Sequence, residues 1–305
     1  MENVVERFLK DVLVFLSGLL IISLALDFFI SKRLRDSSGL NMVIWRDVME
    51  GKASAELLIC GDSRANTDCC PPVIDSITGL FSYSIGVSGQ HFSIEKLRYD
   101  MYRRFNDKPS VVVQLVDCWF FLPVMKYYES QLLPWMWNTA FLKDAFKLEP
   151  RYFARKSFPF LRYHHDDLSG DNVSDRKPIR GFLTFNPSTF SRYNETSFDF
   201  FENHVREEKF RTYLSDLLND GIKIVLVQAP ICGSLSFKDS TLATTRDRFG
   251  SIAEEYGIPF LDYLQRPVYE DSTLFIDSVH LNQKGAVVFS DSLANDLISL
   301  GIIKD

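Results

Sequence analysis

The chain has 305 residues, of which 46% are hydrophobic and 24% charged, and its formal net charge is −6. This is the composition of an ordinary globular protein, and it excludes disordered and fibrous chains. Acidic residues outnumber basic ones and no basic patch dominates, so we expect no nucleic-acid partner. The five cysteines form no CxxC pair or Cys/His cluster, so we also expect no metal site and no cofactor.

The N-terminal segment is the most apolar part of the chain. Between residues 12 and 30 the one formal charge is Asp27, and about 20 apolar residues suffice to cross a bilayer as a helix. We therefore predict a membrane anchor over residues 1–35, with the membrane helix at 12–30. A buried core helix and a signal peptide cleaved near Ser23-Leu24-Ala25 are the alternatives.

The charges that flank this segment give a weak signal for its orientation. Two basic residues precede it and three follow it: Arg7 and Lys10, then Lys32, Arg33 and Arg35. Because positively charged flanks tend to stay in the cytoplasm, this count leans slightly toward a cytoplasmic C-terminal part.

Short apolar runs alternate with helical patterns from Ala55 onward. The predicted strands are residues 56–60, 80–86, 111–116, 222–230 and 258–263, and the predicted helices are residues 94–105, 206–220, 241–257 and 283–300. Runs of this length that are apolar on both faces suit a parallel sheet covered by helices. For residues 36–305 we predict an α/β fold, a three-layer α/β/α flavodoxin-like sandwich with a mostly parallel five-stranded sheet.

Residues 120–201, between the third and fourth predicted strands, break this alternation. Prolines and aromatic residues are dense there, so we predict an aromatic-rich insertion in the domain and not a separate domain. Trp119, Trp135 and Trp137 can form a small core over the sheet, stack on sugar rings, or face lipid near the anchor. The His-His-Asp-Asp run at 164–167 has no partner motif for a metal, and we expect a surface loop there.

Chemically active side chains follow the predicted strands. Gly61-Asp62-Ser63-Arg64 follows the first strand and a loop over 85–90 follows the second. Asp117 follows the third strand, and Asp277-Ser278-Val279-His280 precedes the last helix. Ligands of open parallel sheets bind outside the carboxyl ends of the strands, so this fold brings these side chains to one edge. A hydroxyl, a histidine and a carboxylate are the groups that nucleophilic acyl transfer needs.

Each of these residues also has a purely structural interpretation. Ser63 can cap the helix that follows the strand, and Gly86 can serve only to turn the backbone. His280 can be an ordinary surface or capping histidine. The presence of Ser63, Asp277 and His280 together, in the expected order, favours the catalytic interpretation.

Three blocks together, GDSR after the first strand, a glycine after the second and DSVH before the last helix, look like the SGNH (GDSL-type) hydrolase superfamily. The resemblance extends over residues 56–300 as separate blocks. It implies that Ser63 is the nucleophile, His280 the general base and Asp277 the residue that orients His280. It also implies an oxyanion hole that includes the backbone N–H groups of Ser63 and Gly86.

The third oxyanion donor of that superfamily has no match in this chain. An asparagine is usual there, and the segment LVDCW places Asp117 near its position. An ionised carboxylate accepts hydrogen bonds but cannot donate them. Losing one donor typically lowers the rate by about 10²–10³-fold. Arg64 and Gln90 lie at sequence positions from which they could replace the donor or contact substrate.

The anchor, the blocks GDSR and YSIGVSGQ and the long aromatic insertion are similar to bacterial SGNH proteins that work beside membrane-bound O-acyltransferases. The resemblance implies an esterase or O-acyltransferase that acts on acyl esters, foremost acetyl esters, of cell-envelope or exported polysaccharide. It also implies an extracytoplasmic domain, periplasmic or at the cell surface, against the charge count. The alternative is a catalytically weak accessory protein that binds polysaccharide or an O-acyltransferase.

Overall fold

A computed structural model describes residues 4–124, 129–163, 177–183, 202–232, 239–264 and 266–303. The His-His-Asp-Asp run at 164–167 and much of the aromatic insertion lie outside these described residues. The described residues include the anchor, the sheet, its helices and the first half of the insertion.

The centre of the molecule is a five-stranded parallel sheet, as the sequence predicts. Its strands, in spatial order, are β2 (Ser82–Ser84), β1 (Leu57–Cys60), β3 (Val111–Leu115), β4 (Lys223–Gln228) and β5 (Phe260–Asp262). The order 2-1-3-4-5 is that of flavodoxin-like folds, whose chain reverses direction along the sheet next to β1 and β3. The carboxyl ends of β1 and β3 therefore flank the place where such folds bind ligands.

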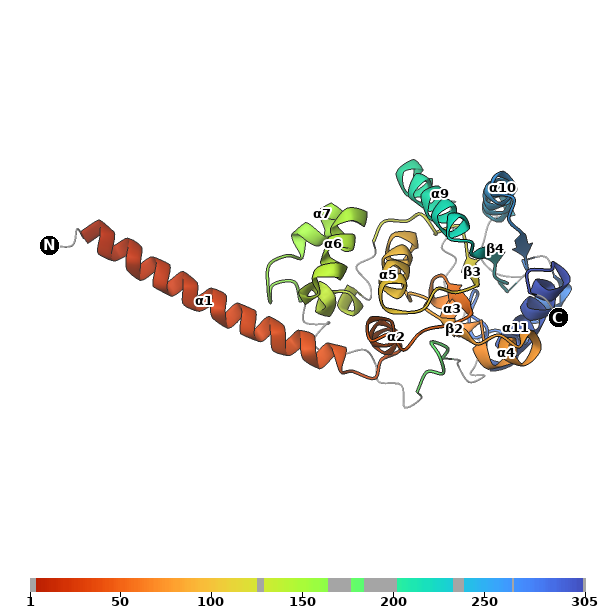
Figure 1. Cartoon of the computed structure of the whole chain (residues 1–305), viewed down its shortest axis with the longest axis horizontal. Coiled ribbons are helices and arrows are strands. Elements are labelled where there is room, and N and C mark those ends of the chain that lie inside the picture. The colour runs from red at the N-terminus through yellow and green to blue at the C-terminus, as the bar shows by residue number, and fades with distance from the viewer. Residues whose placement is uncertain are drawn as a thin grey trace.

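Helices cover both faces of the sheet and complete the three predicted layers (Figure 1). One face carries α2 (Leu40–Met49), α5 (Phe92–Phe105), α9 (His204–Asn219) and α10 (Asp239–Tyr256). The other face carries α3 (Ser63–Thr67), α4 (Pro71–Thr78) and α11 (Gln283–Ser299), and the short helices η3 (Pro267–Glu270) and η4 (Ser272–Leu274) lie before α11.

The strands divide their side chains between these two cores. Leu58 and Cys60 of β1 belong to the core under α5, whereas Leu57 and Ile59 belong to the core under α11. Successive side chains of a strand point to opposite faces, and both faces are covered here. This explains why the strands appear in the sequence as uninterrupted apolar runs.

The described part of the insertion is a helical layer attached to the first core. It contains η1 (Glu129–Gln131), η2 (Leu133–Trp137), α6 (Thr139–Leu148) and α7 (Pro150–Arg155). Trp135 is buried beside Trp45 of α2, with ring centroids 6.3 Å apart, and Phe141 meets Trp45 edge-on at 5.6 Å. Of the roles left open for the tryptophans, Trp135 has the structural one.

The N-terminal segment is one continuous helix, α1 (Val4–Arg35), which projects away from the sheet (Figure 1). It is long and apolar enough to cross a membrane, and its most apolar stretch is almost entirely exposed. Its C-terminal end, however, packs against the domain. Asp27, Ser31 and Leu34 are buried against the insertion and α2.

Candidate active site

The turn after β1 explains why an apolar strand stops at Gly-Asp-Ser. Gly61 has φ +150°, and a Cβ atom there would lie 2.8 Å from the Leu115 Cβ of the neighbouring strand, so a glycine is required. Asp62 is the N-cap of α3, because its carboxylate accepts a hydrogen bond from the Arg64 backbone N–H at 2.9 Å. The capping interpretation of Ser63 is therefore wrong, and its hydroxyl is left for another role.

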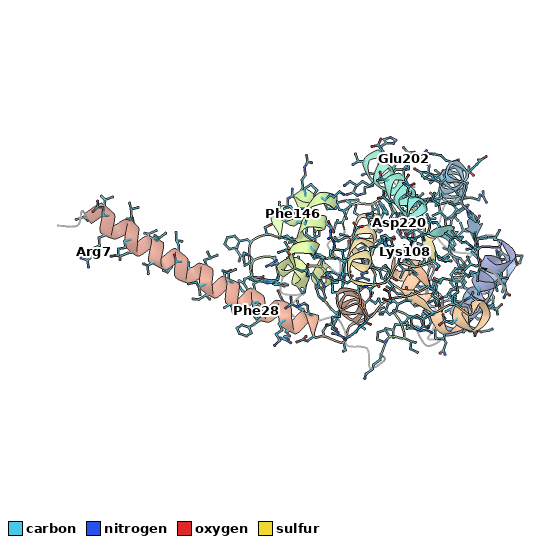
Figure 2. The ribbon with its side chains drawn as sticks, in the orientation of Figure 1. Arg7, Phe28, Lys108, Phe146, Glu202 and Asp220 are labelled. Atoms are coloured by element: carbon cyan, nitrogen blue, oxygen red, sulfur yellow. The ribbon has the colours of Figure 1, made fainter. Side chains whose placement is uncertain are left out.

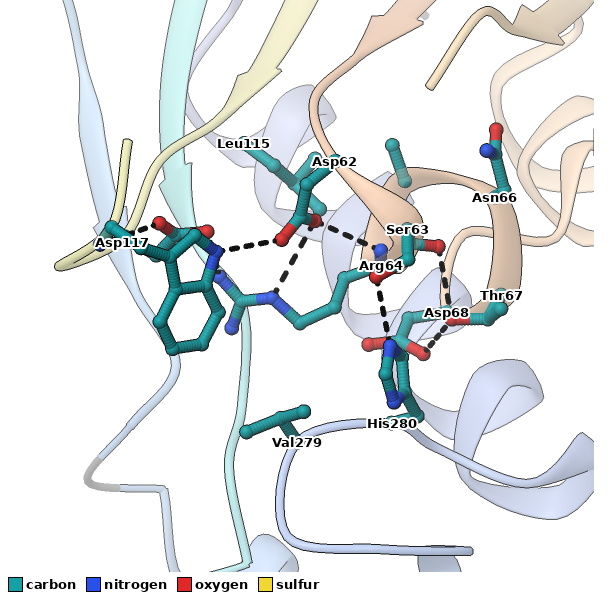
Figure 3. A network of polar contacts seen from close by, with 12 residues as sticks. Asp62, Ser63, Arg64, Asn66, Thr67, Asp68, Leu115, Asp117, Val279 and His280 are labelled. Carbon is teal, nitrogen blue, oxygen red and sulfur yellow. Dashed lines mark hydrogen bonds and ion pairs between the residues drawn. The ribbon is translucent and has the colours of Figure 1, made fainter. Parts of the chain in front are cut away.

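Ser63, His280 and Asp277 come together although Ser63 and His280 are 217 residues apart in the sequence. Figure 3 shows the contact between Ser63 and His280. Ser63 Oγ lies 2.8 Å from His280 Nε2, and His280 Nδ1 lies 2.9 Å from Asp277 Oδ2. The other Asp277 oxygen accepts the backbone N–H groups of Val279 and His280, at 2.9 and 2.8 Å. The loop before α11 thus holds its own acid and histidine in a fixed relation, with the imidazole between serine and carboxylate.

The electrostatics of this group suit a histidine that accepts a proton. Burial lowers the pKa of His280, but the hydrogen bond and charge of Asp277, followed by the charges of Asp68 and Asp62, outweigh burial and raise it above 6.5. Although burial opposes it, the hydrogen bond from His280 keeps the pKa of Asp277 below its ordinary value. Asp277 therefore favours its ionised form, which stabilises the protonated form of His280.

Asp68 is a second buried carboxylate beside this group, and no motif in the sequence predicts its place there. One of its oxygens accepts the Thr67 hydroxyl at 2.7 Å and the Leu281 backbone N–H at 3.0 Å, while its other oxygen has no described partner. It joins the end of α3 to the residue after His280, and Figure 3 shows Asp68 beside Thr67 and His280. Burial raises the pKa of Asp68 to about 7, and the charge of His280 opposes the rise.

The pH dependence of catalysis tests these charges. A general-base histidine must be neutral, so the rate should rise with pH through a His280 pKa that lies above 6.5. Asp68→Asn removes one of the carboxylates that raise this pKa, so the acidic limb of kcat/KM should move to lower pH. Asp107→Asn, at an exposed carboxyl, is the matched control and should leave the limb in place. An unchanged limb in Asp68→Asn would show that Asp68 is only structural.

Gly86 lies beside the turn, where the resemblance places an oxyanion donor. A Cβ atom at Gly86 would lie 2.6 Å from both the Asp62 carbonyl oxygen and Asn66 Oδ1, so only glycine fits. Two buried side chains fix the loop that contains Gly86. Arg98 donates to the Gly86 carbonyl, and Gln131 of η1 donates to the Ser88 carbonyl at 3.0 Å. The Gly86 N–H makes one long contact, 3.4 Å to Ser84 Oγ. No described residue accepts a hydrogen bond from the Ser63 N–H. The backbone N–H groups of Ser63 and Gly86 can therefore both donate to a substrate oxyanion.

Asp117 and Arg64 have a different role from the one the sequence suggested. Arg64 is 1% exposed and donates to Asp117 Oδ2 at 2.8 Å, with Asp62 Oδ1 3.7 Å from its Nε atom. Trp119 stacks on this guanidinium at 5.1 Å, gives its backbone N–H to Asp117 Oδ1 at 3.0 Å, and donates its indole N–H to Asp62 Oδ2 at 2.9 Å. These four residues form a buried cluster that supports the turn (Figure 3).

Two expectations about this cluster need correction. Both oxygens of Asp117 face N–H donors, so Asp117 does not supply the missing oxyanion hydrogen. Arg64 is enclosed between two carboxylates and a tryptophan, so it does not reach substrate. Gln90 is fully buried, which likewise argues against direct contact with a substrate. Trp119 belongs to this cluster, and no local sequence signal predicts that role.

Asp117→Asn separates the supporting role from a donor role. Because both carboxylate oxygens accept, an asparagine amide would have to point its NH₂ at another donor, which leaves one buried contact unmade. We expect a loss of stability of about 1–3 kcal/mol and no gain in ester hydrolysis. Thermal unfolding and initial rates, with the exposed Asp107→Asn as control, check this. A rate increase near 10²-fold would restore the donor interpretation.

Comparisons with known proteins find similar chains among solved structures, at low sequence identity. No family model and no curated protein matches the chain. Among solved structures, a protein of Desulfitobacterium hafniense assigned to the G-D-S-L lipolytic family shares 13% identity, covering 78% of this chain and 97% of that one, at a TM-score of 0.42. A GDSL-like lipase of Bacteroides thetaiotaomicron shares 14%, covering 85% and 98%, at 0.41.

A third similar structure is a protein of Bacteroides fragilis assigned as an acylhydrolase, with 15% identity, covering 81% of this chain and 87% of that one, at a TM-score of 0.37. Identities and TM-scores this low say nothing about substrate. The sheet order and the strand-end position of Gly61-Asp62-Ser63 are features of the chain itself. By these features, the chain has a flavodoxin-like α/β fold in which the Gly-Asp-Ser block follows the first strand, as its resemblance to the GDSL-type (SGNH) hydrolases implies.

Proposed function

We propose that the chain is a serine-dependent SGNH-type esterase or O-acyltransferase that uses Ser63, His280 and Asp277. The observation that carries the proposal is the 2.8 Å contact between Ser63 Oγ and His280 Nε2, with Asp277 on the other imidazole nitrogen. A hydroxyl is a weak nucleophile until a positioned base takes its proton. The raised pKa of His280, caused by Asp277, Asp68 and Asp62 against the effect of burial, makes it a stronger base for that task.

The first half of the reaction forms an acyl-enzyme. Ser63 Oγ attacks the ester carbonyl while His280 Nε2 takes the hydroxyl proton, and Asp277 stabilises the resulting imidazolium. The Ser63 and Gly86 backbone N–H groups face the oxyanion that forms on the carbonyl oxygen. The carbon–oxygen bond to the leaving alcohol then breaks, and His280 returns its proton to that alcohol. The acyl group stays on Ser63.

The second half of the reaction decides between hydrolysis and transfer. His280 takes a proton from water or from a sugar hydroxyl, and the resulting oxygen attacks the acyl carbon of acyl-Ser63. Loss of Ser63 from the tetrahedral intermediate, with the proton returned to Oγ, gives a free acid or a new ester. We propose acetyl esters of cell-envelope or exported polysaccharide as substrates, with the domain of residues 36–305 outside the cytoplasm.

A catalytically weak accessory protein that binds polysaccharide or an O-acyltransferase is the second candidate. This candidate is supported by the incomplete oxyanion hole: Asp117 accepts a hydrogen bond from Arg64 and does not supply the third donor. Activated esters separate the two candidates, since their good leaving groups demand little oxyanion stabilisation. An accessory protein would not turn them over through Ser63.

The test uses the full chain in detergent, because the end of α1 packs on the insertion. Turnover of p-nitrophenyl acetate is followed with and without soluble oligosaccharides, and free acetate and acetylated sugar are measured. We expect slow turnover, with acetyl sugar formed where an acceptor binds. Absence of any turnover that depends on Ser63 would leave the accessory role.

A further inference from the structure

The C-terminal end of α1 is fixed to the aromatic insertion by a buried ion pair. Asp27 is fully buried, and its carboxylate receives the Arg162 Nε and Nη2 atoms at 2.7 and 2.6 Å. The same carboxylate accepts the Phe160 backbone N–H at 2.7 Å and the Trp137 indole N–H at 2.6 Å. One turn earlier, Ser23 Oγ donates to the Pro159 carbonyl at 2.8 Å. The single charge inside the apolar segment is thus completely satisfied.

The outer surface around this buried pair is apolar. We call it the collar, and its five exposed members are Phe28, Phe29, Trp137, Phe158 and Leu161. Phe28 and Trp137 meet edge-on across α1 and η2, with ring centroids 6.1 Å apart. Phe158 and Leu161, which flank the residues bound to Ser23 and Asp27, are 56% and 68% exposed. Figure 2 shows Phe28 on α1, where the helix reaches the body of the molecule.

The length of α1 places the collar relative to a bilayer. The apolar segment begins after Asp11, and contacts with the insertion begin at Ser23. At 1.5 Å per residue, the 11 residues from 12 to 22 extend about 16 Å, whereas the hydrocarbon core is about 30 Å thick. If α1 crosses the membrane, the crossing must continue to about Ile30. The residues that contact Ser23 and Asp27 then lie at membrane depth.

From this geometry we propose that the collar inserts into the lipid bilayer and is a second membrane-binding surface next to α1. The collar would lie at the boundary between the lipid headgroups and the acyl chains. Aromatic side chains favour this boundary, and Lys32 and Arg33 are exposed one turn further along α1, where headgroup phosphates would lie. The proposal rests on α1 crossing a membrane and is independent of the chemistry at Ser63.

The buried ion pair is what makes this placement possible. An unpaired carboxylate in hydrocarbon is costly, and intramembrane charges are normally paired and turned toward protein. Arg162 and the two other N–H donors, Phe160 and Trp137, satisfy Asp27 on the protein side, while the collar faces outward. Phe160 adopts φ +64°, an uncommon conformation for a bulky residue. In this conformation the backbone N–H of Phe160 donates a hydrogen bond to Asp27.

The same insertion also contacts the loop of the candidate active site. Gln131 of η1 donates a hydrogen bond to the Ser88 carbonyl and accepts one from Arg98. Arg98 also donates to the Gly86 carbonyl. A membrane-bound insertion would therefore fix the height and orientation of the sheet edge above the bilayer. The anchor would act as a rigid support and not as a flexible tether.

Site-specific fluorescence in vesicles tests the collar. The five native cysteines are buried, so a thiol-reactive environment-sensitive dye should label an introduced cysteine. Full-length Phe158→Cys and Leu161→Cys are labelled and placed in phosphatidylcholine–phosphatidylglycerol vesicles containing lipids spin-labelled at a shallow or a deep acyl position. Leu19→Cys on exposed α1 is the membrane reference, and Leu300→Cys, near the C-terminus far from α1, is the aqueous control.

We expect blue-shifted emission and quenching by the shallow spin label at 158 and 161, deeper quenching at 19, and neither effect at 300. Probes at 158 and 161 that behave like the one at 300 would overturn the proposal. Probes that are shielded from water but not quenched by lipid would indicate a protein partner, which also overturns it. An unquenched probe at 19 would refute the membrane crossing on which the proposal rests. Circular dichroism of each labelled chain confirms that it is folded.

Discussion

Ser63→Ala is expected to abolish ester hydrolysis by the full-length chain without lowering its stability. Removing the nucleophile of an efficient serine hydrolase lowers kcat by on the order of 10⁶-fold. Here the measurable loss should be at least about 10³-fold, limited by the slow reaction of an incomplete oxyanion hole. Asp62 and not Ser63 caps α3, so the alanine removes no helix cap. Unfolding curves should coincide with those of the wild type.

The control for this variant is Ser76→Ala, at an exposed serine of α4 whose hydroxyl bonds only its own helix. It should keep full activity. Initial rates on p-nitrophenyl acetate at one protein concentration decide the outcome. Full activity in Ser63→Ala would exclude the proposed nucleophile, and equal losses in both serine variants would indicate a trivial loss of protein.

Arg64→Met is expected to cause the largest loss of stability among single substitutions around the site. The guanidinium is almost completely buried between Asp62 and Asp117, and a neutral side chain would leave two buried carboxylates without their shared cation. Removing one partner of a buried ion pair typically costs about 3–5 kcal/mol. For a chain of this size we expect a fall in Tm of roughly 6–20 °C.

Arg103→Met is the matched control, since Arg103 forms a partly exposed ion pair with Asp220 at 2.8 Å. Such pairs contribute about 0–1 kcal/mol, so its Tm should change little. The double variant Arg64→Met/Asp117→Leu should recover part of the loss, because one of the stranded charges is gone. A Tm of Arg64→Met equal to that of Arg103→Met would show that the cluster contributes nothing to the fold.

Much of the fold follows from local sequence patterns. The five strands are apolar runs bounded by polar turns, and their parallel order follows from strand–helix alternation. Ser63, Asp277 and His280 were found because they lie in short blocks at strand and helix ends, where parallel sheets collect ligand-binding side chains. The structure brings all three within hydrogen-bond distance.

The parts that sequence patterns missed depend on contacts between distant residues. Arg64 and Asp117 are 53 residues apart, and Asp27 and Arg162 are 135 apart, with no periodic signal to connect either pair. Trp119 lies two residues beyond Asp117, yet only the folded chain shows that its indole reaches Asp62. The contact between the anchor and the insertion is not predictable from sequence either, because apolarity identifies a membrane segment but not the partner of its one charge.

The most direct measurement of the proposed chemistry is the mass of the Ser63 peptide after a rapid acid quench. The full-length chain is mixed with excess p-nitrophenyl acetate, quenched within the first turnovers, digested and analysed by mass spectrometry. We predict one acetyl group on the peptide that contains Ser63 and none on that peptide in Ser63→Ala. The occupancy of this acetyl group should increase in His280→Ala, or at low pH, if deacylation slows more than acylation. Turnover of the ester with the acetyl group trapped on another residue, or with the same adduct pattern in Ser63→Ala, would contradict a mechanism in which Ser63 is the nucleophile.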